Sequence, residues 1–432
     1  MPSSFNINKY PKTKKYLLLY FHVHQPFRLN NYYSPFDVPD NFDYFGGTEG
    51  NTNDFIINRV ADRCYRPAGE MFLKLAQEAG LKISYSFTGT VLEQLQDKAP
   101  DVIELYQKLH DTGKMEVVCE THYHSLAAFY DLAEFARQVE MHCQELSQIF
   151  SKRPEVFRNT ELTYRNDIGE FIRQMGFKAA FAEGWDPILQ WRSPNYVYRN
   201  KPVEIGAGAE QLAREVNDLA PAPELKLLLK NYHRSDDVAF RFQLKGWEGY
   251  PVTADKFARW VAEEPGYLTT LCMDYETVGE HHRVESGIFE FYKYLPQELA
   301  KQGIEFILPS EAAEAFDSEE ELDYPNIVSW ADAERDLSAW TGNMMQQKAL
   351  QAIYQVGDEV KAKLSRIENE ELRMKVLDVW GKLQTSDHYY YMSTKYWSDG
   401  DVHRYFSPYE TPFQANINFL NVLSKFREEL RK

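Results

Sequence analysis

Short apolar runs alternate with longer amphipathic stretches along the first three quarters of the chain. The short runs predict strands at Tyr16–Val23, Leu81–Phe87, Lys114–Cys119, Glu155–Arg158, Lys178–Ala182, Tyr267–Met273 and Glu305–Leu308. The stretches between them predict helices at Pro67–Ala79, Asp101–Asp111, Leu132–Phe150, Ile168–Met175, Ala254–Ala262 and Ile288–Ala300. Strands that alternate with helices favour a parallel sheet covered by helices, so an α/β barrel is the leading architecture and an open doubly wound sheet the second.

Several predicted helices end at a glycine just before the next strand, namely at Gly80, Gly113, Gly176 and Gly303. Glycine takes the left-handed conformation of a helix C-cap without a Cβ penalty. These positions therefore support the predicted helix ends.

The pattern changes from about Ser318 onward. An acidic stretch is followed by helical periodicity without strands, at Met344–Val356, Asp358–Ile367, Glu370–Leu383 and Pro412–Arg431. We expect residues 1–317 to form the barrel and residues 318–432 a helical subdomain that packs on the active-site cleft. The polar, aromatic-rich segment Gln384–Pro408 is long for a connection, so we expect it to pack on a functional region.

Composition and charge argue against several classes of binding partner. A formal net charge of −17 argues against nucleic acid and anionic membranes, which both need basic patches. The four cysteines, Cys64, Cys119, Cys143 and Cys272, lack metal-type spacing. The N-terminus shows no charged segment followed by an apolar one, and the run Tyr16–Val23 is too short to span a membrane. We therefore expect a cytoplasmic protein.

In barrels of parallel strands the reactive residues lie at the C-terminal ends of the strands. The first predicted strand ends at His22 and His24, which alternation places on the same side. The third ends near Glu120 and His124, and the fourth leads to Glu161. Two neighbouring imidazoles need polar partners, so we expect a polar cavity here rather than two structural histidines.

A later apolar strand runs directly into Asp274 and Glu276 and then reaches His281. The end of a buried strand is a costly place for carboxylates, which indicates a functional role. The structural alternative is capping of a helix by Asp274 or Glu280.

Five ordered segments resemble those of glycoside hydrolase family 57, the family of α-amylases, 4-α-glucanotransferases and branching enzymes. They are His22-x-His24-Gln25-Pro26, Gly113-Lys114-Met115-Glu116-Val117, the Glu161 segment, Asp274-Tyr275-Glu276-Thr277-Val278-Gly279-Glu280-His281 and Leu308-Pro309-Ser310-Glu311. Segments around Trp340 and Asp387 are also similar to the family, whereas the lead-in Arg158-Asn159-Thr160 departs from it.

The resemblance implies an irregular seven-stranded (β/α) barrel followed by helices, a retaining mechanism, and no metal or cofactor. It implies Glu161 as nucleophile and Asp274 as general acid/base. The substrate-binding candidates are His22, His24, Glu120, His124, Glu276, His281, Trp340, Asp387 and His388.

The chemistry of retention agrees with two carboxyl groups. They need to lie about 5–5.5 Å apart. At an effective dielectric near 20, two carboxylates about 5 Å apart repel by about 3 kcal/mol, which corresponds to roughly 2 pKa units. One group then stays protonated near neutral pH while the other ionises.

The sequence thus predicts an α-amylase-like hydrolase that cleaves α-1,4-glucosidic bonds of starch- or glycogen-type glucans or maltooligosaccharides. A 4-α-glucanotransferase or a branching enzyme is the alternative on the same scaffold. A metal-dependent polysaccharide deacetylase or amidohydrolase would instead use the histidines as ligands. A non-catalytic glycan-binding protein would bind the same sugar without turnover.

Overall fold

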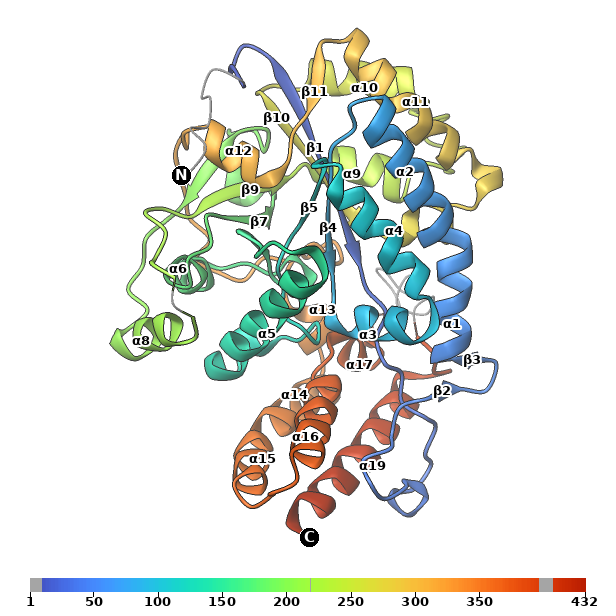
Figure 1. The fold of residues 1–432 in the computed structure, drawn as a ribbon, viewed down its shortest axis with the longest axis vertical. Helices are drawn as coiled ribbons and strands as arrows, with labels where there is room; N and C mark the ends of the chain where they lie inside the picture. The colour runs from blue at the N-terminus through green and yellow to red at the C-terminus, as the bar shows by residue number, and fades with distance from the viewer. Residues whose placement is uncertain (1–9, 218, 396–406) are drawn as a thin grey trace.

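A ring of parallel strands forms the centre of the protein. The computed structural model describes residues 10–217, 219–395 and 407–432. The ring runs through β1 (Lys15–Val23), β4 (Ile83–Phe87), β5 (Met115–Val117), β6 (Val156–Arg158), β7 (Ala179–Glu183), β9 (Lys226–Lys230) and β10 (Leu268–Asp274), which pairs with β1 again. Between β5 and β6 it closes through one bridge, Cys119 to Phe157. The irregular seven-stranded barrel is therefore confirmed (Figure 1).

Both faces of the strands are buried, which explains why they read as nearly continuous apolar runs. In β1, Leu17, Leu19 and Phe21 join the core under the helices. Alternate residues Tyr16 and Leu18 belong to a separate cluster shared with other strands. Alternation along one strand thus separates two cores.

Helices follow most strands and cover the barrel. They are α1 (Asn53–Val60), α2 (Arg66–Glu78), α3 (Gly89–Lys98), α4 (Pro100–Asp111), α5 (Leu132–Phe150), α6 (Asn166–Gln174), α7 (Asp186–Leu189), α8 (Ala207–Glu215), α9 (Tyr232–Ala239), α10 (Ala254–Glu263), α11 (Ile288–Lys301) and α12 (Pro309–Ala315). The predicted glycine ends are confirmed, since Gly80, Gly113, Gly176 and Gly303 have φ of 71°, 69°, 94° and 72°.

The predicted set of strands needs two corrections. First, the sequence pattern did not reveal two neighbouring strands. They are β9, in which three leucines lie between Lys226 and Lys230, and β8 (Val197–Asn200), which runs antiparallel to β9. The strand expected at 305–308 is β11 (Ile304–Phe306); it pairs with the start of β1 and lies outside the ring. Pairing with β7, rather than local periodicity, makes β9 a barrel strand.

The C-terminal helices pack directly on the barrel. They are α13 (Ser338–Thr341), α14 (Met344–Gln355), α15 (Gly357–Leu364), α16 (Glu370–Leu383), α17 (Ser386–Tyr390) and α19 (Pro412–Arg431), and most lie beneath α3 and α5 in Figure 1. One apolar cluster contains barrel residues such as Phe157 together with Leu350 and Trp380. Short β12 (Glu321–Leu322) still pairs with β8, so strand pairing continues beyond residue 318.

The remaining predictions concern the domain boundary, the segment Gln384–Pro408 and the cellular location. The domain boundary after residue 317 stays a prediction. The segment Gln384–Pro408 begins as α17, and its residues 396–406 lie outside the described part of the chain. Within the described ranges, no helix is long and apolar enough to cross a membrane. The expected cytoplasmic location stays a prediction.

Candidate active site

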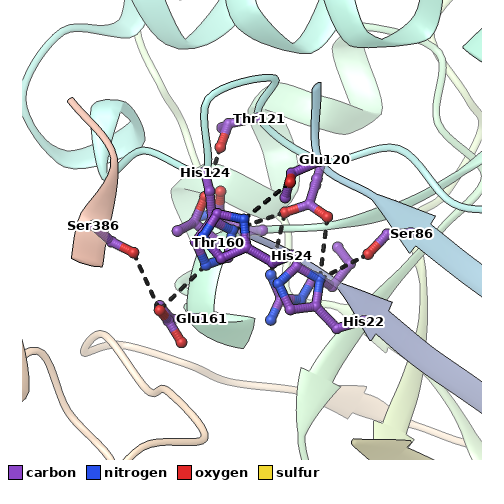
Figure 2. A network of polar contacts seen from close by, with 12 residues as sticks. His22, His24, Ser86, Glu120, Thr121, His124, Thr160, Glu161 and Ser386 are labelled. Atoms are coloured by element: carbon purple, nitrogen blue, oxygen red, sulfur yellow. Dashed lines mark hydrogen bonds and ion pairs between the residues drawn. The ribbon is translucent and has the colours of Figure 1, made fainter. Parts of the chain in front are cut away.

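The C-terminal ends of the barrel strands bring most of the predicted site residues together. His22 comes from β1, and its Cα pairs with that of Asp274 at the end of β10. Glu120 and His124 follow β5, and Glu161 lies in a single helical turn after β6, Thr160–Leu162. Figure 2 shows His22, His24, Glu120, His124 and Glu161 around one polar network.

Glu120 is the buried anchor of this network. Its Oε1 lies 3.3 Å from His22 Nδ1, and its Oε2 lies 3.0 Å from His124 Nδ1 and 3.4 Å from Arg158 Nη1. Burial opposes its ionisation, but His22, His124 and Arg158 together hold the pKa of Glu120 well below its usual range. This carboxylate thereby orients both imidazoles from behind.

The Glu161 carboxylate receives three hydrogen bonds from the described part of the chain. Its Oε1 accepts from His124 Nε2 at 3.2 Å and from Ser386 Oγ at 3.1 Å (Figure 2). Its Oε2 accepts from the indole Nε1–H of Trp330 at 2.9 Å. Ser386 belongs to α17, and Trp330 belongs to the segment before α13, so residues outside the ring help to hold this side chain.

The electrostatic environment keeps Glu161 ionised. Burial would raise its pKa, but the hydrogen bond and charge of His124, together with Arg158, lower it to about 2. The pKa of His124 is shifted in the opposite direction. Burial disfavours its charge, yet hydrogen bonds to Glu120 and Glu161 raise its pKa to about 9. The two groups therefore form a charged pair at neutral pH.

Asp274 has the opposite acidity. Burial and then the negative charge of Glu161 raise its pKa to about 6. Burial and then Asp274 raise the pKa of Glu276 to about 8, while Tyr65 and Gln25 donate to its Oε1. Asp274 makes no helix-capping hydrogen bond to any described residue, which disfavours the capping alternative.

His24 and Asp387 extend the network toward α17. His24 Nε2 lies 2.8 Å from Asp387 Oδ2, and its Nδ1 lies 2.9 Å from Thr88 Oγ1. Burial opposes ionisation of Asp387, but His24 and then His124 lower its pKa below the usual range. The predicted placement of His22 and His24 on one side of the strand is confirmed, because their rings stack 5.7 Å apart.

The backbone around the nucleophile candidate is strained. Glu161, Leu162 and His124 have φ of 56°, 53° and 53°. These angles lie in the left-handed region, which residues other than glycine rarely adopt. Such residues cost about 1–3 kcal/mol each and occur mainly where surrounding contacts fix them. The hydrogen bonds to Glu161 are such contacts.

Three predicted substrate-binding residues lie apart from these contacts. Trp340 and His388 are 1% and 3% exposed, and Trp340 belongs to the apolar core that the helices share with the barrel. The packing of Trp340 in this apolar core disfavours direct contact with a sugar, whereas burial alone does not, since His22 and His124 are as buried. His281 is half-buried, and its backbone N–H donates to the Glu276 carbonyl. Substrate contacts of all three stay predictions.

The sequence interpretation missed Arg158, Trp330 and Ser386. Arg158 is fully buried at the end of β6, and its cost in an apolar strand was a usable signal. Ser386 precedes Asp387 in a segment that already resembled the family. No local pattern pointed to Trp330, which is 169 positions from Glu161 in the sequence.

Among the described residues, the group that could hold a metal consists of three of the same histidines. His22, His24 and His124 each offer a ring nitrogen, and these atoms lie within 4.8 Å of one another. His124 is protonated at neutral pH, because its pKa is about 9, and a ligand must be deprotonated. Metal binding would therefore displace a proton and the bond from His124 to Glu161.

A (β/α) barrel with two interacting carboxyl groups of opposite acidity at its strand ends offers the pair of groups that glycoside hydrolases use. The sequence model of Glycosyl hydrolase family 57 matches residues 18–325, and the chain belongs to this family.

Similar proteins agree with this membership. A Methanocaldococcus jannaschii protein named "Putative alpha-amylase" is 38% identical over 417 residues, which cover 95% of this chain and 84% of that protein. A branching enzyme from Pyrococcus horikoshii has a TM-score of 0.65 at 14% identity, over 91% of this chain and 87% of that one. A 4-alpha-glucanotransferase from Thermococcus litoralis has a TM-score of 0.56 at 16% identity; the match covers 91% of this chain but only 54% of that enzyme.

Proposed function

We propose that this protein is a retaining, α-amylase-like hydrolase of α-1,4-glucosidic bonds in starch- or glycogen-type glucans or maltooligosaccharides. The opposed acidity of Glu161 and Asp274 carries the proposal that two carboxyl groups cleave a glycosidic bond, because this reaction needs one ionised and one protonated group. Retention is what the resemblance to the family implies. Family membership and the amylase name of the Methanocaldococcus jannaschii relative support it.

In the first step the Glu161 carboxylate attacks C1 of the sugar. Its Oε1 already accepts two hydrogen bonds, whereas Oε2 accepts one, from Trp330. A carboxylate oxygen offers about two lone-pair sites, so Oε2 keeps one for C1. Asp274 gives its proton to the glycosidic oxygen as the C1–O bond breaks, and the leaving glucan departs with a free hydroxyl group.

In the second step Asp274, now ionised, takes a proton from water. The water oxygen bonds to C1, and Glu161 leaves as a carboxylate. The three donors to Glu161 make that carboxylate a stable leaving group. Two displacements at C1 return the starting anomeric configuration.

Transfer to another glucan is the alternative, because the structurally similar proteins include a 4-alpha-glucanotransferase and a branching enzyme. In that reaction a sugar hydroxyl replaces water in the second step. The proposed site residues are otherwise the same.

The test is incubation with a maltooligosaccharide of a single length, followed by product sizing and by NMR of the newly formed anomer. Hydrolysis gives only shorter products, and retention gives the α-anomer first. Products longer than the substrate would assign transfer instead. The β-anomer as first product would overturn the retaining mechanism. A chelated sample serves as control, since loss of activity that zinc restores would favour the metal-dependent alternative.

A further inference from the structure

A second set of buried charges lies at the ends of β7 and β9, next to Trp330, which donates to Glu161. Glu183 and Lys230 are Cα partners at the strand ends, and both are nearly inaccessible to solvent. Glu183 Oε2 lies 3.3 Å from Lys230 Nζ and 2.9 Å from Arg335 Nη1. Asp236 lies further out, 3.8 Å from Lys230 and 3.9 Å from Arg335. The steps proposed above use none of these groups.

Arg335 closes a turn that begins at Ser329. The backbone N–H of Ser329 donates to the Arg335 carbonyl at 3.0 Å, and Arg335 itself has a φ of 50°. The guanidinium group lies 4.3 Å from the ring centre of Tyr232, on α9. The side chain that ends this turn is therefore fixed to the barrel by a charge pair and by a ring contact.

Trp330 lies in the same turn and reaches Glu161. Its indole N–H donates to Glu161 Oε2 at 2.9 Å, and its backbone N–H donates to the Glu161 carbonyl at 3.3 Å. Its ring centre lies near two cations, 4.6 Å from the Arg158 guanidinium and 5.5 Å from Lys230 Nζ. Lys230 therefore contacts both Trp330 and the Glu183 carboxylate that holds Arg335.

We propose that the Glu183–Arg335 ion pair is a positioning device for the nucleophile, because it clamps the Ser329–Arg335 turn so that Trp330 donates to Glu161. This inference rests on the proposed function, in which Glu161 attacks the sugar. A buried ion pair is a poor source of stability compared with apolar packing. Its geometry, by contrast, fixes the direction of the turn.

The pair acts on catalysis through one hydrogen bond. Without the Trp330 donor, Glu161 retains, among the described residues, the two donors on Oε1. The ionised form then loses stabilisation, so its pKa rises and the acid limb of the pH profile moves to higher pH. The attacking oxygen also loses its orientation, which lowers kcat more than it changes KM.

The experiment is a double-mutant cycle with Arg335→Gln, Trp330→Phe and both together, measured on the full chain with a maltooligosaccharide. We expect kcat to fall about 10-fold in Arg335→Gln and about 10- to 100-fold in Trp330→Phe. The double variant should be no slower than Trp330→Phe, because Arg335 acts through Trp330. The acid limb should move upward in both single variants. Losses that multiply in the double variant, or an unmoved acid limb, would overturn the inference.

Two further variants keep the test decisive. Arg335→Lys retains the buried charge with less reach, and we expect it to recover part of the kcat lost in Arg335→Gln. If Arg335→Gln does not fold, Arg335→Lys takes its place in the cycle. Arg199→Gln, which removes an exposed pair with Glu321, is the matched control and should leave kcat unchanged. Wild-type turnover that survives Glu161→Gln would overturn the proposed function itself, whereas multiplied losses alone would overturn only this inference.

Discussion

The two ends of the barrel use buried charge in opposite ways. At the N-terminal end of the strands, Lys82 donates to Glu311 and to Tyr10, and Glu116 accepts two hydrogen bonds from Ser310. These contacts join strands β4 and β5 to helix α12. Each link is direct and lies far from the proposed chemistry in the barrel.

At the C-terminal end the polar groups are less completely satisfied. Arg158 Nε and Nη2 and His22 Nε2 are buried, and none has a hydrogen-bond partner among the described residues. Left-handed backbone occurs at Glu161 and His124 in the same region. Such sites cost stability, and natural proteins retain them where function needs them. The contrast teaches that buried charge alone does not identify a site; here buried charge coincides with strain and unsatisfied groups only at the C-terminal end.

The sharpest test of this contrast compares Glu161→Gln with Glu311→Gln. Glutamine at 161 is isosteric but cannot attack C1, so we expect kcat to fall by about 10⁴-fold or more. The melting temperature should fall as well, because the substitution leaves the buried His124 imidazolium without its charged partner. Steady-state kinetics and thermal melting on the same samples measure both effects.

The control at the other end should lose stability without losing activity. Glu311→Gln weakens the bond to Lys82, so we expect lower melting temperature with nearly unchanged kcat below the melting range. Equal kinetic losses in both variants would show that the two ends do not differ in role.

Asp274→Asn tests the acid. We expect kcat/KM on maltooligosaccharides to fall about 10²- to 10⁴-fold, the usual contribution of general acid–base catalysis. The kcat/KM for an α-glucosyl fluoride, whose leaving group needs no protonation, should fall much less, because this ratio reports the first step alone. An equal loss on maltooligosaccharides and on the fluoride would contradict the role of Asp274 as acid.

The wild-type pH profile tests both carboxyl groups. Asp274 must be protonated and Glu161 ionised, so wild-type kcat/KM should fall as pH rises through about 6 and as pH falls toward about 2.

Local pattern was sufficient for the strand ends that carry chemistry. Apolar runs that stop at His22 and Asp274 placed both residues at one end of a parallel barrel, and the structure pairs their Cα atoms. A difference in pKa between the two carboxyl groups was also predictable, because proximity and burial shift a pKa in known directions. Which group is ionised depends on His124 and Arg158, whose contacts the pattern did not reveal.

Contacts between distant segments were not predictable. The sugar contact of Trp340 stays a prediction for a side chain that lies in the core. The hydrogen bond from Trp330 to Glu161 was not predicted. The direction of the turn that carries Trp330 depends on Arg335 and Glu183, which are 152 positions apart. Likewise β9 becomes a barrel strand through its pairing with β7. Periodicity contains no information about such partners.

The smallest expected effect concerns Glu116, at the N-terminal end of the barrel. Burial raises its pKa from 4.5 to about 7, although two hydrogen bonds from Ser310 partly oppose this. The folded protein then holds a proton that the unfolded chain releases. The resulting stability is fully present below pH 4.5 and is lost as pH rises through about 7. By linkage this amounts to about 3 kcal/mol at most.

Glu116→Gln should therefore flatten the pH dependence of the free energy of unfolding between these limits. Glutamine accepts from Ser310 without a charge, so at pH 8 we expect the variant to be more stable than the wild type by about 1–3 kcal/mol. At pH 4 the two should be equal. Urea unfolding at several pH values measures this, with Glu305→Gln as control, since Glu305 forms an exposed pair with Lys14 at the same end. A wild-type stability that does not fall between pH 4 and 8 would show that Glu116 is ionised at little cost, and the two ends of the barrel would then differ in geometry rather than in charge.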